Sequence, residues 1–397
     1  MVEWQTVKLG NIASINQSTY SSKEDWKFVN YLDTGNITMN QVDEIQYINT
    51  SVDKLPSRAK RKVRFNSIIY STVRPNQLHY GIIKNQPDNF LVSSGFAVID
   101  IDFDKAAPEY IYYVLIQQEI TEYLQSIAEQ SVSAYPSIKP SDIENLEFLL
   151  PDRETQEKIV SILRSIDEKI VHNNEINNNL EHQAEALFHL LFVENVNPIW
   201  KNGMLSDLGT IVAGGTPSKT KPEYYSEKGI AWITPKDLSL NKSKFISHGE
   251  IDISELGFSK SSAIKMPSGT VLFSSRAPIG YIAIAANEVT TNQGFKSVVP
   301  NENVGTAFMY YLLKFLLPTI EGMASGSTFK EISGAGMKSI PVVIPDNETI
   351  DKFNAFCTPI FQQQEVLEAE NSRLVDIREA LLPKLMAGEL DVSDIEL

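Results

Sequence analysis

Apolar residues recur at alternating steps of four and three in two long stretches of the chain. The first series runs from Ile159 to Leu191, and the second runs from Phe353 to Leu385, 194 residues later at every position. Eight of ten positions in the first series and seven of ten in the second are apolar. This is the heptad pattern of a coiled-coil seam, so the sequence predicts two long helices of matching pattern.

The ends of both predicted helices carry residues typical of helix caps. Asp152 and Asp346 each follow a proline where an N-cap acceptor belongs, and Gly388 suits a helix C-terminus. Asn177 and Asn371 fall at equivalent positions of the two seams, where a buried amide can fix the register of paired helices. We therefore expect two capped helices that pair in a defined register.

The two predicted helices are separated by a whole globular module, so they can pair in an antiparallel coiled coil. Their polar faces are strongly acidic and their lengths match, which favours pairing with each other. The alternative is that each helix packs on a separate globular core. Pro359 does not fit a straight helix, so we expect a kink or irregular first turns in the second one.

The remaining chain alternates short apolar segments with loops rich in Ser, Thr, Asn, Gly and Lys. These segments predict strands at 67–72, 90–101, 269–274, 280–285 and 295–299, and one helix in each half, at 108–127 and 306–323. The fold class is therefore expected to be α+β.

The chain also repeats itself at an offset close to that of the two helices. Residues 9–15 match 205–211, and the tyrosine pair at 112–113 matches the pair at 310–311. Because such matches keep the same order along the chain, we expect two copies of one module. The predicted parts are a globular module at 1–150, a helix at 151–196, a second module at 197–344, and a second helix with a C-terminal tail at 345–397.

The charge distribution changes what the net charge of −15 implies about partners. Residues 152–194 hold nine acids and four bases, and residues 346–397 hold twelve and four, so the acidity belongs to the helices. By contrast, residues 54–87 contain eight bases and no acid, and residues 256–287 contain three bases and no acid. Local basic stretches of this kind are suited to a polyanion such as DNA.

Several other function classes find no support in the sequence. No apolar run approaches the roughly 18 residues that span a bilayer, and the N-terminus lacks the regions of a signal peptide, so we expect a soluble, cytoplasmic protein. The single cysteine, Cys357, excludes a disulfide framework and a Cys-based zinc site, and we expect it in the helix core. The five histidines form no close ligand pair, so we expect no metal.

Motifs for catalysis are also incomplete. Residues 197–200 (Asn-Pro-Ile-Trp) resemble the Asn-Pro-Pro-aromatic motif of amino-methyltransferases, but the second proline and an upstream glycine-rich cofactor loop are missing. Residues 213–216 lack the spacing of a phosphate-binding loop. We therefore expect neither catalytic residues nor a cofactor in this chain.

The whole chain resembles the specificity (S) subunit of type I restriction-modification enzymes. The segments that carry the resemblance are 267–281 (PSGTVLFSSRAPIGY), 291–296 (TNQGFK), 324–329 (ASGSTF) and 381–390 (LLPKLMAGEL), with 57–63 (SRAKRKV) and 70–76 (YSTVRPN) in the first copy. The first copy has Leu78-His79-Tyr80 where the second has Ile279-Gly280-Tyr281, so no base contacts are carried over from the family.

The resemblance implies a non-catalytic subunit with two target-recognition domains, each reading one half of a split site in double-stranded DNA. It further implies that the helices set the gap and dock two methyltransferase subunits, which carry S-adenosylmethionine, and that a translocase-nuclease subunit completes the restriction enzyme. One alternative is an acidic coiled-coil adaptor that never touches DNA. Another is a stand-alone adenine methyltransferase, for which the chain offers no cofactor loop.

Both modules contain side chains that we expect to face DNA. They are Arg58, Lys60, Arg61, Lys62, Arg64, Arg74, Asn76 and Gln77 in the first module, and Thr216, Ser218, Lys219, Ser274, Ser275, Arg276, Tyr281, Gln293 and Lys296 in the second. The lysines and arginines at 58–64 are expected to grip phosphate, while the donors at 74–77 can read G or A edges. The alternative for 58–64 is a solvated edge strand, and for the two serines a strand-end hydrogen bond.

Overall fold

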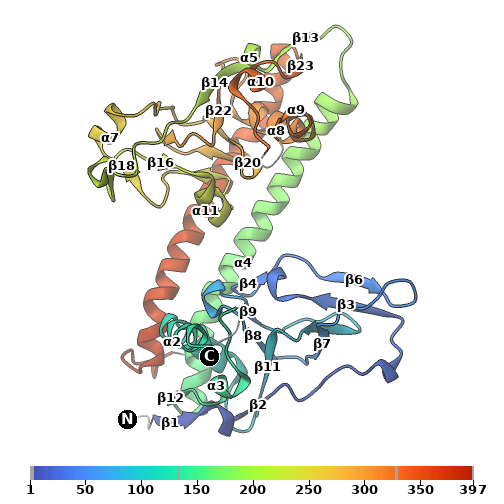
Figure 1. Ribbon diagram of the computed structural model, residues 1–397, viewed down its shortest axis with the longest axis vertical. Coiled ribbons are helices and arrows are strands. Elements are labelled where there is room, and N and C mark those ends of the chain that lie inside the picture. The colour runs from blue at the N-terminus through green and yellow to red at the C-terminus, as the bar shows by residue number, and fades with distance from the viewer. Residues whose placement is uncertain (1–3, 132–134, 327–329, 396–397) are drawn as a thin grey trace. The chain divides into compact units, whose positions relative to one another are not determined.

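The computed structural model describes residues 4–131, 135–326 and 330–395 (Figure 1). The chain divides into two compact units. Unit 1 comprises Met1–Lys169 with Leu374–Leu397, and unit 2 comprises Ile170–Arg373. This division cuts through both long helices, whereas the division expected from the sequence separates helices from globular modules. Those module boundaries therefore stay a prediction.

In the part of unit 1 that the structure describes, the globular module forms four sheets and three short α-helices. Its strands are β1 (Gln5–Lys8), β2 (Ala13–Ile15), β3 (Phe28–Leu32), β4 (Ile37–Thr38), β5 (Gln41–Val42), β6 (Gln46–Asn49), β7 (Ala59–Lys62), β8 (Ile68–Ser71), β9 (Tyr80–Ile82), β10 (Phe90–Ser93), β11 (Phe96–Ile101) and β12 (Glu147–Leu150). Its helices are α1 (Pro108–Leu115), α2 (Gln118–Glu129) and α3 (Pro140–Glu144). The two larger sheets have the strand orders β6-β3-β10-β7 and β2-β11-β8-β9.

The globular part of unit 2 repeats this arrangement. Its strands are β13 (Lys201–Met204), β14 (Gly209–Ala213), β15 (Tyr225–Ser226), β16 (Trp232–Ile233), β17 (Phe245–Ile246), β18 (Asp252–Ile253), β19 (Val271–Ser275), β20 (Ile279–Ala285), β21 (Thr290–Thr291), β22 (Lys296–Pro300) and β23 (Pro341–Ile344). Its helices are α5 (Leu205–Leu208), α6 (Pro235–Leu240), α7 (Glu255–Ser259), α8 (Thr306–Phe315), α9 (Leu317–Met323) and α10 (Gly334–Lys338). The order β14-β22-β19-β20 matches β2-β11-β8-β9 strand for strand, so the predicted repeat and α+β class are confirmed.

Three segments that the sequence predicts as continuous are interrupted. The strand expected at 90–101 is two strands, because β10 pairs parallel with β3 in one sheet while β11 pairs antiparallel with β8 in the other. The helix expected at 108–127 is α1 followed by α2, and the one expected at 306–323 is α8 followed by α9. In the second case Pro318 lies in the first turn of α9, where proline is tolerated although it cannot continue α8.

The first long helix, α4 (Arg153–His189), and the second, α11 (Asn347–Met386), begin at the predicted caps. The Thr155 N–H donates to Asp152 Oδ1 over 2.9 Å, and the Thr349 N–H donates to Asp346 Oδ1 over 2.9 Å. At the other end of α11, Gly388 adopts a left-handed φ of 69°, which closes the helix as expected. A π-helical turn, Leu190–Glu194, follows α4.

Within each unit the two long helices pack against each other in antiparallel directions. In unit 1, Arg378 Nη1 on α11 lies 2.8 Å from Asp167 Oδ1 on α4, and Lys158 Nζ donates to Ser393 O beyond the end of α11. Apolar seam residues of both helices belong to the same core, which also receives α1. The predicted antiparallel coiled coil is therefore confirmed, and the helices also contact the globular cores.

In unit 2 the helix pair contains a layer of amides. Asn173 Nδ2 donates to Asn371 Oδ1, and Asn371 Nδ2 donates to Asn174 Oδ1, each over 2.8 Å. Asn177 contributes its main-chain carbonyl, which accepts from Gln364 Nε2 at 3.1 Å. Of the two seam asparagines, Asn371 therefore bonds to the other helix through its side-chain amide, and Asn177 does so through its main chain.

Pro359 does not interrupt the second helix. α11 is helical without a break from Asn347 to Met386, so the irregular first turns expected for it are wrong, and the alternative of a kink near Pro359 stays a prediction. Phe353, Cys357 and Ile360 are buried in the core of unit 2, and this packing outweighs the local cost of a proline within a helix. Cys357 is therefore a core residue, as predicted.

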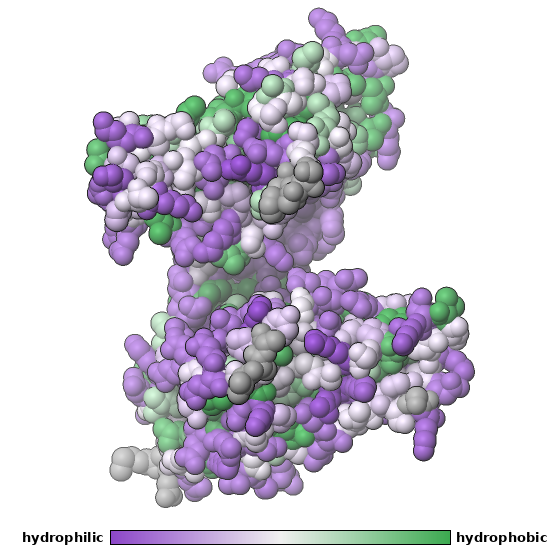
Figure 2. All heavy atoms as spheres, viewed as in Figure 1, coloured by the Kyte–Doolittle hydropathy of each residue, from purple (hydrophilic) through white to green (hydrophobic). Residues whose placement is uncertain are grey.

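Polar side chains dominate the visible surface of both units, with smaller hydrophobic patches between them (Figure 2). Across the described ranges, no helix is both long enough and apolar enough to cross a membrane.

Candidate nucleic-acid interface

The basic stretch of unit 1 lies on the last strand of the sheet β6-β3-β10-β7. β7 pairs with β10 on one side, and on the other side residues 18–20 bond to it: the Tyr20 N–H donates to Lys60 O over 2.8 Å, and the Lys62 N–H donates to Ser18 O over 3.1 Å. Arg58 and Lys60 are exposed there, whereas Arg61 and Lys62 are half-buried. The main chain of β7 is thus paired on both sides, while the side chains of Arg58 and Lys60 are exposed and able to meet a phosphate backbone, so the DNA contact stays a prediction.

Two bases of this stretch are paired with acids from distant parts of the sequence. Lys62 Nζ contacts the Glu24 carboxylate and lies 5.1 Å from the centroid of the Trp26 ring. Arg64 Nε lies 3.1 Å from Asp100 Oδ1. Phosphate binding by Lys62 or Arg64 would therefore have to replace an existing ion pair.

Arg58 also has an acidic neighbour. Burial raises the pKa of Asp33, but hydrogen bonds from the Thr34 N–H, Ser93 and Tyr31 outweigh it, and the charge of Arg58 adds to them, so the pKa lies below its usual value. The carboxylate is thus ionised, and its negative charge offsets part of the positive charge of Arg58.

The segment from Arg74 to Gln77 forms a short 3-10 turn on the surface of unit 1. Arg74 has a left-handed φ of 48°, its N–H donates to Pro136 O over 3.0 Å, and its guanidinium lies 5.4 Å from the centroid of the Tyr135 ring. Asn76 and Gln77 are exposed. The turn therefore presents three donor side chains to solvent, as reading of base edges would require.

In unit 2 several predicted residues line one open cavity of about 620 Å³. Thr216, Lys219, Arg276 and Gln293 lie on its walls, although they are far apart in the sequence. Its other main lining residues, none of which is predicted from the sequence, are Tyr225, Trp232, Lys236, Asp237, Glu250 and Asn292. Ser218 lies outside the lining, and its hydroxyl contacts Thr220 Oγ1 at 2.9 Å.

The walls of the second-unit cavity are fixed by close main-chain contacts. The Trp232 indole N–H donates to Gly215 O over 2.9 Å. A Cβ on Gly215 would lie 2.3 Å from Ala263 N, so only glycine allows this approach. Thr234 caps α6, with its hydroxyl and N–H both donating to Asp237 Oδ2. The Thr-Pro-Lys-Asp sequence at 234–237 is a capping signal and could have pointed to this wall.

An amide, cationic groups and acidic groups all lie at the cavity. Gln293 is exposed, and its N–H lies 3.5 Å from Thr216 Oγ1. Lys236 Nζ lies 2.5 Å from Glu250 Oε2, and Arg276 Nη1 lies 3.3 Å from Glu331 Oε2. Because these cations are balanced by acids, the cavity is better suited to hydrogen bonding with base edges than to gripping phosphate.

The remaining predicted residues of unit 2 are mostly internal. Ser274 Oγ donates to Pro278 O over 2.9 Å, and Ser275 Oγ donates to Gly294 O over 3.0 Å. Both serines are 0% exposed, and Lys296 is buried with its Nζ 3.5 Å from Glu331 Oε1. Tyr281 is half-buried and donates its N–H to Ser274 Oγ. These contacts match the strand-end alternative, and in this structure neither serine hydroxyl is open to DNA.

The described residues contain no group of three or more His, Cys, Asp or Glu side chains placed to hold a metal ion. The segment 324–329, one of those that carry the family resemblance, extends outside the described residues at 327–329.

Comparison with protein families gives a match over most of the chain. The family described as type I restriction modification DNA specificity domain matches residues 1–182 and again residues 198–368. Each match covers one globular module and part of the long helix that follows it, α4 as far as residue 182 and α11 as far as residue 368. This result supports a role in DNA sequence specificity and does not support the acidic adaptor that never touches DNA.

Individual proteins agree with the family match. The chain is 27% identical to the type I restriction enzyme HindI specificity subunit of Haemophilus influenzae, over 98% of this chain and 100% of that protein. A part covering 38% of the chain is 39% identical to the MjaIX specificity subunit of Methanocaldococcus jannaschii, over 36% of that protein. The crystal structure of the type I restriction-modification S subunit from M. genitalium has the same fold, with a TM-score of 0.58 at 17% identity over 97% of this chain and 96% of that one.

Proposed function

The chain belongs to the type I restriction-modification DNA specificity family, and from this membership we propose that it binds double-stranded DNA at a two-part sequence. Each module reads one half-site, and the helix pair sets the gap between the half-sites. The observation that carries the proposal is the double family match, 1–182 and 198–368, in which each copy contains a globular module and the first part of the long helix that follows it. Two copies of a DNA-reading module in one chain call for two separate half-sites.

The long helices are proposed to dock two methyltransferase subunits. Residues 152–194 and 346–397 carry 21 acids against eight bases, so they are poor ligands for phosphate. Acidic helices are instead suited to a protein partner with a complementary surface. A translocase-nuclease subunit is proposed to join the same assembly for restriction.

Catalysis is proposed to reside in these partners. The methyltransferase subunits would supply S-adenosylmethionine and the active site, and this chain would supply only the choice of sequence. Purified alone, it should give no binding signal with S-adenosylmethionine in calorimetry and should methylate no DNA. Methylation by the isolated chain would contradict this part of the proposal.

The decisive test is to map methylated adenines in cells that express this chain with its methyltransferase subunit. We expect methylation at one two-part sequence with a fixed gap, and none when this chain is omitted. The control exchanges the second module, 197–344, for that of another family member. The second half-site should then change while the first is retained. A continuous target, or methylation independent of this chain, would overturn the proposal.

A further inference from the structure

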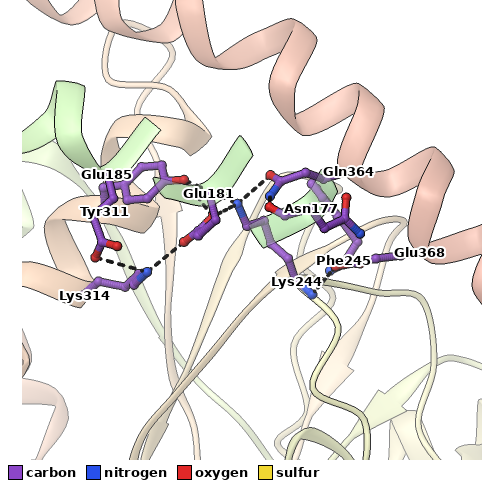
Figure 3. A network of polar contacts seen from close by, with 9 residues as sticks. All are labelled: Asn177, Glu181, Glu185, Lys244, Phe245, Tyr311, Lys314, Gln364 and Glu368. Carbon is purple, nitrogen blue, oxygen red and sulfur yellow. Dashed lines mark hydrogen bonds and ion pairs between the residues drawn. The ribbon is translucent and has the colours of Figure 1, made fainter. Parts of the chain in front are cut away.

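A buried lysine joins the globular part of unit 2 to both long helices. Lys244 lies just before β17 and is 8% exposed. Its Nζ contacts the Glu181 carboxylate on α4 and lies 2.7 Å from Gln364 Oε1 on α11 (Figure 3). Tyr311 of α8 is close by, with its hydroxyl 3.4 Å from the same Nζ. One ammonium group thus bonds to side chains of three helices.

The main chain of the same segment is held as well. The N–H groups of Lys244 and Phe245 donate to the two carboxylate oxygens of Glu368 on α11, over 2.8 and 3.1 Å. Burial raises the pKa of Glu368, and these two hydrogen bonds oppose the rise. A single helix carboxylate therefore fixes two successive residues of the loop, so the backbone position before β17 is set by α11.

The surroundings of Lys244 hold its ammonium group in one place. Burial lowers the pKa of Lys244, but Glu181 opposes this through its charge and its hydrogen bond. The Nζ also lies 4.3 Å from the centroid of the Phe361 ring and 4.9 Å from that of Tyr310, within the range of cation–π attraction. A buried pair contributes little net stability, yet it penalises every arrangement that separates the partners.

The segment that contains Lys244 connects two walls of the second-unit cavity. Lys236 and Asp237 precede Lys244 in the sequence and line the cavity, and Glu250 follows it and lines the cavity too. The Lys244 carbonyl also accepts the Ile284 N–H of β20 over 2.7 Å. The contact of Lys244 with the helices therefore acts on the chain segment that shapes the candidate DNA-facing surface.

From this geometry we propose that Lys244 is a positioning residue that holds the DNA-facing cavity of the second module in one orientation on the helix pair, and so sets the gap between the half-sites. The proposal rests on the proposed function. Lys244 touches no base in this account. Replacing Lys244 should therefore weaken the preference for one gap length and leave both half-site sequences unchanged.

The test uses the full chain expressed with its methyltransferase subunit and maps methylated adenines, comparing the wild type with Lys244→Met. Methionine keeps the length and apolar stem of lysine without its charge. We expect the preference for the wild-type gap over gaps one base pair longer or shorter to fall about tenfold, the change that accompanies loss of one interaction of ordinary strength. Lys201→Met, which removes an exposed lysine of β13 in the same unit, is the matched control and should leave the gap unchanged.

A second variant distinguishes loss of positioning from a folding defect. Lys244→Met leaves Glu181 without its main partner, so the double variant Lys244→Met with Glu181→Gln removes both charges and should relax the gap in the same way. An unchanged gap preference in either folded variant overturns the proposal, as does an altered half-site sequence. If both variants fail to fold, Lys244 serves folding alone and the proposal is again overturned. Failure of the proposed function is distinguishable, because the wild type would then lack a two-part target.

Discussion

The two units use equivalent tyrosines to contact α4, but they supply the balancing cation from different places. Tyr113 of α1 donates to Asp167 Oδ2 over 2.7 Å in unit 1, and Tyr311 of α8 donates to Glu181 Oε2 over 2.8 Å in unit 2. The two tyrosines occupy matching positions of the sequence repeat. Both tyrosines therefore bond to α4, although the helix of unit 2 that corresponds to α4 in the repeat is α11.

The units differ in the origin of the cation that pairs with the carboxylate on α4. In unit 1 the partner of Asp167 is Arg378 of α11, so the ion pair joins one long helix to the other. In unit 2 the partners of Glu181 are Lys244 and Lys314, both from the globular module. The helices of unit 2 are joined instead by amides. The ion pair of unit 1 thus joins the two long helices, whereas the ion pairs of unit 2 attach the globular module to α4.

Burial makes the second arrangement more sensitive to change. The side chains of Lys244 and Glu181 are 7% and 20% exposed, against 17% and 30% for Arg378 and Asp167. Removing one partner of a buried pair leaves a desolvated charge, and that cost grows with burial. The two attachments should therefore respond differently to matched substitutions.

The largest expected effect is that of Glu181→Gln, which removes the carboxylate beside Lys244. Breaking a buried pair in this way costs about 3–5 kcal/mol. The matched change in unit 1, Asp167→Asn, should cost about 1.5–3 kcal/mol, the usual range for a hydrogen bond to a charged group. Hydrogen exchange of α8 and α1 in the two variants measures the difference locally. Equal loss of protection in both units would contradict the comparison.

The acid sensitivity of unit 2 should have the same origin. Burial raises the pKa of Glu181, but the charges and hydrogen bonds of Lys244 and Lys314 outweigh it and lower the pKa to about 2 from its ordinary 4.5. A carboxyl group with a depressed pKa stabilises the folded state above its unfolded pKa, and this stabilisation disappears as the pH falls toward the folded pKa. The difference in protection of α8 between wild type and Glu181→Gln should therefore be full near neutral pH and shrink from about pH 4.5 to 2. A constant difference across that interval would refute the assignment.

Sequence reasoning predicts the helices well because their signals are local and periodic. The heptads, the caps at Asp152 and Asp346, and the order of repeated segments all appear in the structure. The Lys244 contacts could not be predicted, because 63 residues separate Lys244 from Glu181 and 120 separate it from Gln364. No local pattern records which lysine of a polar loop will be buried.

Some features of the candidate site could likewise be predicted from the sequence, and others could not. An acid-free run of bases predicts an exposed basic strand, and β7 carries it as the last strand of a sheet. Sequence alone cannot show that Glu24 and Asp100 neutralise two of those bases. In unit 2 the cavity is assembled from several loops, so sequence reasoning reaches only Arg276 and Gln293 in the family-like segments and Thr216 and Lys219 in a polar loop. The serines at 274 and 275 are buried, and sequence cannot show this because a strand-end hydroxyl looks the same whether it faces a ligand or a carbonyl.

Base reading should be confined to one half-site for each unit. Gln293→Ala should weaken binding by about 1–3 kcal/mol for the preferred base at one position of the second half-site only. Gln77→Ala should have the corresponding effect on the first half-site. Competition binding with DNA substituted at each position distinguishes the two. If either variant weakened binding evenly at every position, the side chain would contact phosphate rather than a base.

The smallest expected effect concerns phosphate contacts. It tests whether the exposed bases of β7 bind the DNA backbone. Lys60 is exposed, whereas Lys62 contacts Glu24. If Lys60 neutralises one phosphate, Lys60→Ala should reduce the slope of log affinity against log salt by about 0.9 and weaken binding to all sequences alike, by about 1 kcal/mol. Lys62→Ala should reduce the slope less, because part of its charge is already compensated in the free protein. Lys219→Ala provides the same measurement for unit 2. A slope that Lys60→Ala leaves unchanged would assign β7 to a solvated surface rather than to DNA, and the contact of unit 1 with the backbone would then have to come from the turn at Arg74.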